Sequence, residues 1–325
     1  MATTEMAATL SPATTGVNPW WTYEEQALPG IGKAMVNVGT GNLLVQSDDV
    51  DVAERGIDLA FRRTYNSQST HDVSGTDGTP PSVYGNGWTN PFDVHLAYNA
   101  SANTLSVYDL DGARYDYSGA TGLPLTAGMQ GTMVYSDGLC GFYWLKKSGT
   151  YYYFWEPAGM SNAASCNYPA EAGYAGRVSQ IVARNHNNSV TFSYSWAGGN
   201  ESSDQNITQI VATHSDGQKL TLAFATFGSY NELSSITRPD GALITYSYDT
   251  SGNLLEVTRP GNATDDATRT QTITQLSEQY QYYPQSHMLQ VVSSPRYVTS
   301  GGTDGSYTAV VYSADTPSEA GPSFV

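Results

Sequence analysis

A unit of two short strands joined by a turn occurs three times between residues 181 and 248, and this repetition limits the fold more than any other feature. The units begin at Ile181, Ile210 and Ile236, with a loose spacing of 29 and 26 residues. The second strand of each unit, such as Val190-Thr-Phe-Ser-Tyr194, alternates large apolar with small residues, as a strand with one buried face does. A short hairpin cannot bury its apolar face alone, so neighbouring hairpins must stack. The repeats predict an elongated or spiralling antiparallel sheet.

The turn residues and the composition support the same fold class. Asp-Gly, a strong hairpin signal between alternating strands, occurs at residues 77–78, 111–112, 137–138, 216–217, 240–241 and 304–305. The 325 residues include 24 Tyr and 32 Gly, whereas only 14% are charged. Tyr and Thr suit a pleated, half-buried surface, and Gly and Asp suit tight turns. We therefore predict an all-β protein.

Changes in sequence character divide the chain into three parts. Residues 1–22 are predicted to be a disordered tail or linker, because the Ala- and Thr-rich start lacks an apolar run. The same lack argues against a signal peptide there, and no stretch reaches the length of a membrane span. Residues 23–118 are strand-rich but irregular, which predicts a β-rich cap domain before the repeats. Residues 119–325 are predicted to form the hairpin repeats.

The net charge of −16 restricts the partners. A surface this acidic repels phosphate backbones and anionic lipids, so we expect no binding to nucleic acid or to a membrane surface. We expect no membrane insertion because no stretch is long enough to span a membrane. One interpretation of the charge is solubility outside the cell. The other is an acidic lining that holds a basic cargo.

Several short motifs occur in a recognisable order. The passage from Arg238 to Gly261 contains a Gly turn, Tyr-x-Tyr-Asp at residues 246–249 and Gly-Asn-Leu at residues 252–254. This passage resembles the RHS/YD-repeat family. Further upstream, three motifs resemble the entry domain that precedes such repeats: Thr40-Gly-Asn-Leu-Leu44, Phe61-Arg-Arg-Thr-Tyr-Asn-Ser67 and Tyr84-Gly-Asn-Gly-Trp88.

The resemblance implies a structural protein. Members of the family are bacterial polymorphic toxins, insecticidal toxin-complex shells, wall-associated proteins and animal adhesion proteins, in which the repeat sheet spirals into a hollow shell. This chain departs from the pattern because it contains no Asp-Pro dipeptide, whereas the self-cleaving core of many toxin shells carries paired Asp-Pro motifs. No separate toxin-like domain follows the repeats either. The resemblance implies either a fragment of a longer shell or a short member with a different function, secreted or at the cell surface.

Sequence signatures of catalysis or metal binding are absent. The chain has no Gly-x-Ser-x-Gly elbow and no phosphate-binding loop. The five histidines lie at least 24 residues apart, so no local metal pair exists. Asp48, Asp49 and Asp51 form an acidic cluster that suggests either a Ca²⁺ site or a solvated strand end, and we favour the latter because no Glu follows at loop spacing. We predict no catalytic residue, no cofactor and no metal.

Aromatic clusters provide a candidate ligand or partner surface, formed by Trp20, Trp21, Tyr151, Tyr153 and Trp155. A consecutive run in a strand points its side chains to both faces, so we favour packing in the core and, on the second face, in the lumen of a curled sheet over a ligand platform. Trp88 is expected in the core. Four arginines, Arg62, Arg63, Arg238 and Arg259, are expected to make ion pairs and aromatic stacks on the sheet surface.

The predicted function is a non-catalytic shell or scaffold segment, whose partners are other domains of a longer polypeptide or further copies of the chain. One alternative is a self-assembling extracellular filament joined by β-strand addition at exposed sheet edges. Another is a carbohydrate-binding adhesin that uses the aromatic clusters, with a glycan as partner. Cys140 and Cys166 would form a disulfide in an oxidising compartment or remain buried thiols.

Overall fold

The computed structural model describes most of the chain between residues 15 and 324. The described residues are 15–18, 21–54, 56–69, 82–125, 131–136, 141–157, 160, 176–199, 203–261, 275–284, 286–295, 298, 301–302, 307–312 and 322–324. Trp20, Cys140 and Cys166 lie outside this set, as does most of the predicted tail. The described residues form antiparallel β-sheets with short 3-10 turns between them, which confirms the predicted all-β class.

Two smaller sheets come first in the chain. A five-stranded sheet consists of β1 (Tyr23–Leu28), β2 (Gly32–Asn37), β3 (Leu43–Val52), β4 (Leu59–Asn66) and β5 (Trp88–Thr89). A three-stranded sheet follows, with β6 (His95–Asn99), β7 (Thr104–Tyr108) and β8 (Arg114–Ser118). In both sheets each strand pairs with the strands that precede and follow it in the sequence.

The remaining described strands form one 14-stranded sheet in strict chain order from β9 to β22. They are β9 (Gly131–Ser136), β10 (Gly141–Lys146), β11 (Tyr151–Trp155), β12 (Val178–Val182), β13 (Ser189–Trp196), β14 (Ile207–His214), β15 (Lys219–Phe227), β16 (Tyr230–Thr237), β17 (Leu243–Tyr248), β18 (Leu254–Pro260), β19 (Gln275–Tyr282), β20 (Leu289–Ser293), β21 (Tyr307–Tyr312) and β22 (Pro322–Phe324). Serial pairing of this kind confirms the sheet of consecutive hairpins that the repeats predict.

Five hairpin turns share one geometry, which explains the recurrent glycines. In each turn the first residue donates its N–H to the carbonyl of the fifth residue, and the glycine donates its N–H back to the carbonyl of the first. The turns cover residues 109–113, 146–150, 214–218, 238–242 and 249–253. The glycine in each adopts a φ between +78° and +99°, a region in which an L side chain is strained. This is a three-residue loop closed by a glycine bulge.

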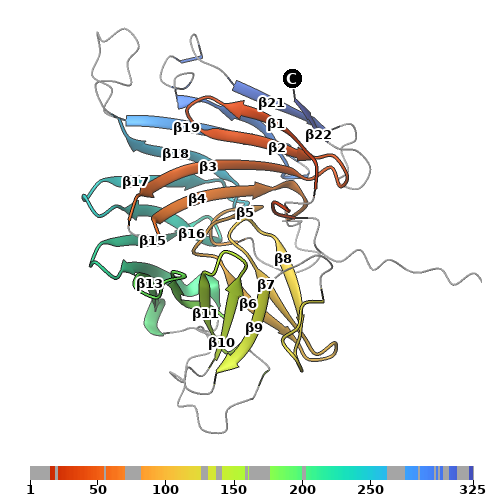
Figure 1. Ribbon diagram of the computed structural model, residues 1–325. Helices are drawn as coiled ribbons and strands as arrows, with labels where there is room; N and C mark the ends of the chain where they lie inside the picture. The colour runs from red at the N-terminus through yellow and green to blue at the C-terminus, as the bar shows by residue number, and fades with distance from the viewer. Residues whose placement is uncertain are drawn as a thin grey trace, which may run out of the picture.

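The five-stranded sheet packs across the middle and late strands of the large sheet, as the red and orange strands over the blue and teal strands show (Figure 1). Aromatic side chains fill the space between the layers, with ring centroids 6.4 Å apart for Phe61 and Tyr246 and 5.2 Å apart for Trp88 and Tyr280. The Tyr65 hydroxyl accepts a 2.9 Å hydrogen bond from the N–H of Leu289. Trp88 is 2% exposed, which confirms its predicted place in the core.

The three-stranded sheet packs against the early strands of the large sheet in the same way. The indole N–H of Trp144 on β10 donates a 2.5 Å hydrogen bond to the hydroxyl of Tyr117 on β8. The large sheet therefore turns its apolar face toward the two smaller sheets, and side chains of residues 28–117 complete its core. Among the residues with described structure, no helix is both long and apolar enough to cross a membrane.

Candidate functional site

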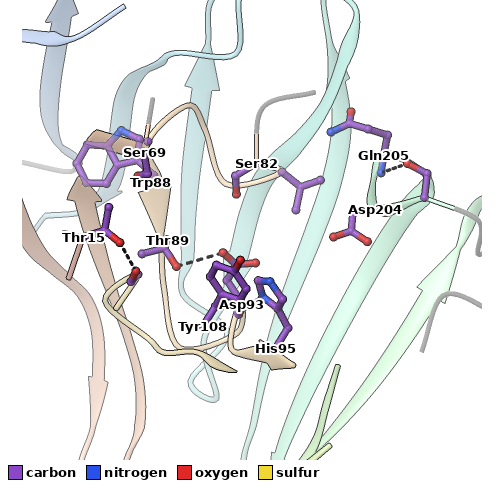
Figure 2. Close-up of a pocket in the computed structure, with 14 residues that line it drawn as sticks. Thr15, Ser69, Ser82, Trp88, Thr89, Asp93, His95, Tyr108, Asp204 and Gln205 are labelled. Atoms are coloured by element: carbon purple, nitrogen blue, oxygen red, sulfur yellow. Dashed lines mark hydrogen bonds between the residues drawn. The ribbon is translucent and has the colours of Figure 1, made fainter. Parts of the chain in front are cut away.

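A pocket of about 480 Å³, with a mainly apolar lining that carries several polar side chains, opens where the smaller sheets meet the 3-10 turn η5 (Asp204–Asn206) beside the large sheet. Its lining includes Thr89, Asp93 and His95 on one side and Asp204 on another. Figure 2 shows Asp93 and His95 close together, whereas Asp204 stands apart. The pocket thus brings together polar groups from parts of the chain more than 100 residues apart in sequence.

Asp93 and His95 are held by local contacts. The Thr89 hydroxyl donates a 3.1 Å hydrogen bond to the Asp93 carboxylate, and His95 Nδ1 lies 2.6 Å from the Asp93 carbonyl oxygen. The His95 ring stacks on Tyr108 at a centroid distance of 4.6 Å. Burial raises the pKa of Asp93, although the neighbouring His95 opposes this change. These groups can hydrogen-bond a polar ligand.

The hydroxyl groups at the pocket have other partners. Ser69 donates its hydroxyl to the Asn66 carbonyl oxygen at 3.1 Å, and Ser82 accepts the N–H of Tyr84 at 3.3 Å. Within the described structure neither serine is hydrogen-bonded to His95, as a serine nucleophile would be to its histidine base. Across the pocket, the Asp204 carboxylate forms an ion pair with Arg177.

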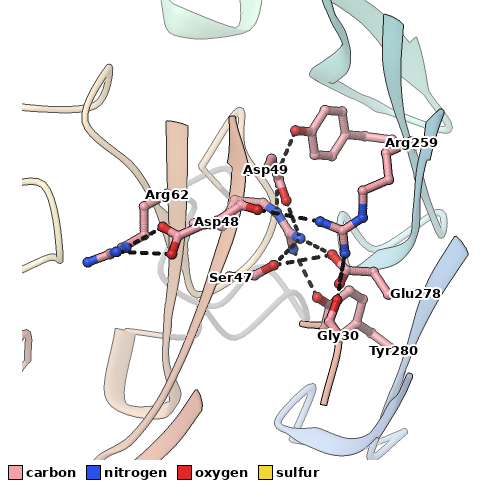
Figure 3. A network of polar contacts seen from close by, with 10 residues as sticks. Gly30, Ser47, Asp48, Asp49, Arg62, Arg259, Glu278 and Tyr280 are labelled. Carbon is pink, nitrogen blue, oxygen red and sulfur yellow. Dashed lines mark hydrogen bonds and ion pairs between the residues drawn. The ribbon is translucent and has the colours of Figure 1, made fainter. Parts of the chain in front are cut away.

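A second polar centre lies buried between the layers, around Arg63 of β4. Its guanidinium donates to the Asp49 carboxylate at 2.6 and 2.9 Å and to Ser47 Oγ at 3.1 Å. It also donates to the Glu278 carboxylate of β19 and, at 3.1 Å, to the Tyr280 hydroxyl. Figure 3 shows these partners converging from the two sheets. The network therefore joins the five-stranded sheet, which contains β3 and β4, to the 14-stranded sheet, which contains β19.

Aromatic rings surround this cation on several sides. The Arg63 guanidinium carbon lies 5.0 Å from the Trp88 ring centroid and 5.5 Å from that of Tyr280. The Tyr246 hydroxyl donates a 2.6 Å hydrogen bond to Asp49, and Arg259 pairs with the other Glu278 oxygen at 3.1 Å. Burial alone would lower the pKa of Arg63, but the nearby acidic groups raise it well above its ordinary value, so the side chain stays charged.

A β-bulge brings Asp49 into this network. Asp48 pairs with Arg62 and Val50 pairs with Phe61, so Asp49 is an extra residue in β3. The bulge allows Asp49 and Val50 both to be buried, while Asp48 remains exposed. The predicted solvated strand end is therefore wrong for Asp49, because the bulge breaks the simple alternation of the strand.

The four arginines have different environments. Arg62 with Asp48 and Arg238 with Asp240 form the expected exposed ion pairs, at 2.5 and 3.0 Å. The surface position predicted for Arg63 is wrong, since its side chain is only 2% exposed. Sequence reasoning also missed the partners Glu278 and Tyr280. One signal was available, because Tyr246-x-Tyr248 and Tyr280-x-Tyr282 repeat, and the first tyrosine of each pair contacts the network.

The candidate aromatic surface separates into two regions. On β11, Tyr151 and Tyr153 are half-buried and pack beside Tyr143 at centroid distances of 6.0 Å each, while the alternate residues Tyr152 and Phe154 are buried. Trp155 is also half-buried. Trp21 instead precedes β1 of the five-stranded sheet, whereas β11 belongs to the 14-stranded sheet. The structure therefore groups the β11 residues without Trp21, and ligand binding there stays a prediction.

Comparisons with known families match two parts of the chain. The model described as Domain of unknown function (DUF6531) matches residues 33–117, which contain β2 to β8 apart from the ends of the first and last strands. The model described as RHS Repeat matches residues 229–264, from β16 to the end of β18. The matched regions include Arg63 and Asp49 together with Tyr246 and Arg259 of the network, whereas Glu278 and Tyr280 lie outside them.

Two solved structures align with most of this chain at low sequence identity. The crystal structure of TcdB2-TccC3-TEV aligns with 91% of this chain at 11% identity and a TM-score of 0.29. The crystal structure of TcdB2-TccC3-Cdc42 aligns with 93% at 10% identity and a TM-score of 0.28. This chain spans 16% and 17% of the length of those chains. No curated protein sequence matches.

Proposed function

We propose that this chain, which belongs to the RHS/YD-repeat family, is a non-catalytic wall segment of a secreted or surface-located shell. The main support is the layered architecture: 14 described strands in chain order form a continuous wall, and the smaller sheets fill its apolar face. Serial hairpins make a wide, stiff surface from a modest core. Such a wall would enclose, display or connect other domains of a longer polypeptide.

The proposed division of labour follows the predicted boundaries. Residues 23–118 would act as the entry domain that packs on the wall, and residues 119–325 would supply the wall itself. The Arg63 network would fix the relative position of the two parts, because Arg63 on β4 forms ion pairs with residues of both β3 and β19. Of the predicted tail, residues 15–18 and 21–22 are described, and the first of these segments lies against the entry domain, with the Gly16 N–H donating to Asn66 at 2.8 Å.

Electron microscopy combined with light scattering tests this proposal on the purified chain. A wall segment whose partners are other domains should give discrete particles with the mass of one chain, 34.9 kDa. Regular filaments or rings would contradict it, and would favour self-assembly by strand addition at the outer strands of the described sheet, β9 and β22.

The tyrosine group on β11 favours carbohydrate binding as a second candidate function. Tyr151 and Tyr153 are nearly parallel, with an interplanar angle of 17°, so they present two faces on which sugar rings can stack. We expect Trp155→Ala to abolish the binding of a glycan by the wild-type chain on a glycan array. Trp21→Ala should leave that binding unchanged, because Trp21 precedes β1 of a different sheet. A wild-type chain that binds no glycan would remove this candidate.

A further inference from the structure

Three side chains with metal-binding groups meet where the five-stranded sheet reaches the hairpin turns of the 14-stranded sheet. Glu54 follows β3, His214 ends β14, and Asp216 lies in the turn to β15. One potential ligand atom from each residue lies within 4.8 Å of the others. His214 Nδ1 is 2.8 Å from an Asp216 carboxylate oxygen. The sequence predicts no metal site because local spacing cannot show that Glu54 and His214, 160 residues apart, are neighbours.

Two buried polar atoms of this cluster lack a hydrogen-bond partner among the described residues. His214 is 2% exposed, yet its Nε2 has no hydrogen-bond partner in the described part of the chain, and the same holds for Glu54 Oε1. A buried polar atom without a partner is unfavourable, and an ion or water bound there is a common explanation. Protein contacts among the described residues therefore account for Nδ1 of this buried imidazole, which lies against the Asp216 carboxylate and accepts the Asp216 N–H at 3.3 Å, but not for Nε2.

The charges point to a cation. The ligand oxygens of Glu54 and Asp216 lie within 4.8 Å of each other, and the Asp58 carboxylate, which accepts the Glu54 N–H at 2.8 Å, adds a further negative charge nearby. Among the described residues, neither carboxylate pairs with a lysine or arginine. Two carboxylates at this distance repel each other unless a proton or a metal ion lies between them.

We propose that Glu54, His214 and Asp216 bind a divalent metal ion of the zinc class. Zinc takes imidazole nitrogen and carboxylate oxygen at about 2.0–2.2 Å, so the ligand atoms of a tetrahedral site lie roughly 3.3–3.6 Å apart. The ligand atoms here lie within 4.8 Å of one another, so the side chains must close by up to about 1.5 Å around the ion. Calcium fits less well, because it prefers six to eight oxygen ligands. The ion would tie the loop after β3 to the β14–β15 turn and so fasten the two layers together.

Isothermal titration of the full chain, first stripped with EDTA, with ZnCl2 as the probe tests the site. We expect one Zn²⁺ per chain, and at least tenfold weaker binding after Glu54→Gln or Asp216→Asn, since each removes one of three ligands. Asp240→Asn is the matched control: Asp240 occupies the same position in another Asp-Gly turn but pairs with Arg238 at 3.0 Å, so zinc binding should not change.

Thermal unfolding provides a second readout that does not depend on heats of binding. Zn²⁺ should raise the midpoint of the wild type and of Asp240→Asn, but not that of Glu54→Gln. Zinc binding that survives both ligand substitutions would place the ion elsewhere and overturn the proposal. Absence of saturable zinc binding, or binding of CaCl2 alone, would also overturn it. None of these outcomes depends on the particle shape that tests the wall function.

Discussion

Arg63→Met should lower the free energy of unfolding by about 3–5 kcal/mol, one of the two largest effects expected of a single substitution here. The replacement would leave the carboxylates of Asp49 and Glu278 buried, with side chains 0% exposed, without the cation that pairs with both. Removing one member of a buried ion pair costs this much because an uncompensated charge remains in a medium that solvates it poorly. Urea denaturation followed by tryptophan fluorescence measures the change.

The adjacent residue provides a matched control for this prediction. Arg62→Met removes the same side chain, but Arg62 and its partner Asp48 are 47% and 54% exposed, so water replaces the lost contact. We expect a loss below about 1 kcal/mol, as is usual for exposed ion pairs. Equal losses for the two variants would show that the network does not join the layers. Arg63→Lys should rescue little, because an ammonium cannot reproduce the two-pronged contact with Asp49.

Glu232→Gln should stabilise the protein at neutral and alkaline pH. Glu232 on β16 is 0% exposed, and burial raises its pKa from 4.5 to about 9, an effect that the nearby N–H of Gly85 opposes. Between these two pH values the folded protein keeps a proton that the unfolded chain has released. The free energy of unfolding therefore falls by about 1.4 kcal/mol per pH unit through this window.

The size of the effect follows from the width of this window. At pH 7.5 the protonation of Glu232 should make the free energy of unfolding of the wild type up to about 4 kcal/mol lower than at pH 4.5. The glutamine variant should not show this loss. Near pH 4 both proteins hold a neutral side chain at this position, so their stabilities should agree. Denaturation curves at pH 4, 5, 6, 7 and 8 give the comparison.

Other buried acids contribute a slope of the same sign, which the variant retains. Burial raises the pKa of Asp93 and Glu278, and raises that of Asp111 to about 6. The difference between the two curves therefore isolates Glu232. Glu24→Gln, at an exposed position on β1, should shift stability by less than about 0.5 kcal/mol at every pH. A pH-independent difference for Glu232→Gln would mean that this carboxyl is not kept neutral by burial.

The amino-acid sequence by itself determines the hairpins and their order. Val190, Phe192, Tyr194 and Trp196 are buried on one face of β13, as their alternation requires, and the described Asp-Gly turns lie between strands. These features are local: a strand exposes alternate side chains to opposite faces, and a glycine permits the turn, whatever the rest of the chain does. The family resemblance also rests on such local motifs.

Only the tertiary structure decides which residues make the polar centres. Arg63 and Glu278 lie 215 residues apart, and their meeting depends on how the two sheets stack. The bulge at Asp49 adds one residue to β3, so each later residue of the strand faces the opposite side. A strict alternation of apolar and polar residues does not predict such a shift. The same stacking brings Glu54 to His214 and Asp93 toward Asp204. Periodicity specifies which face of a strand is buried, but the partner on the opposing layer is fixed only when the layers pack.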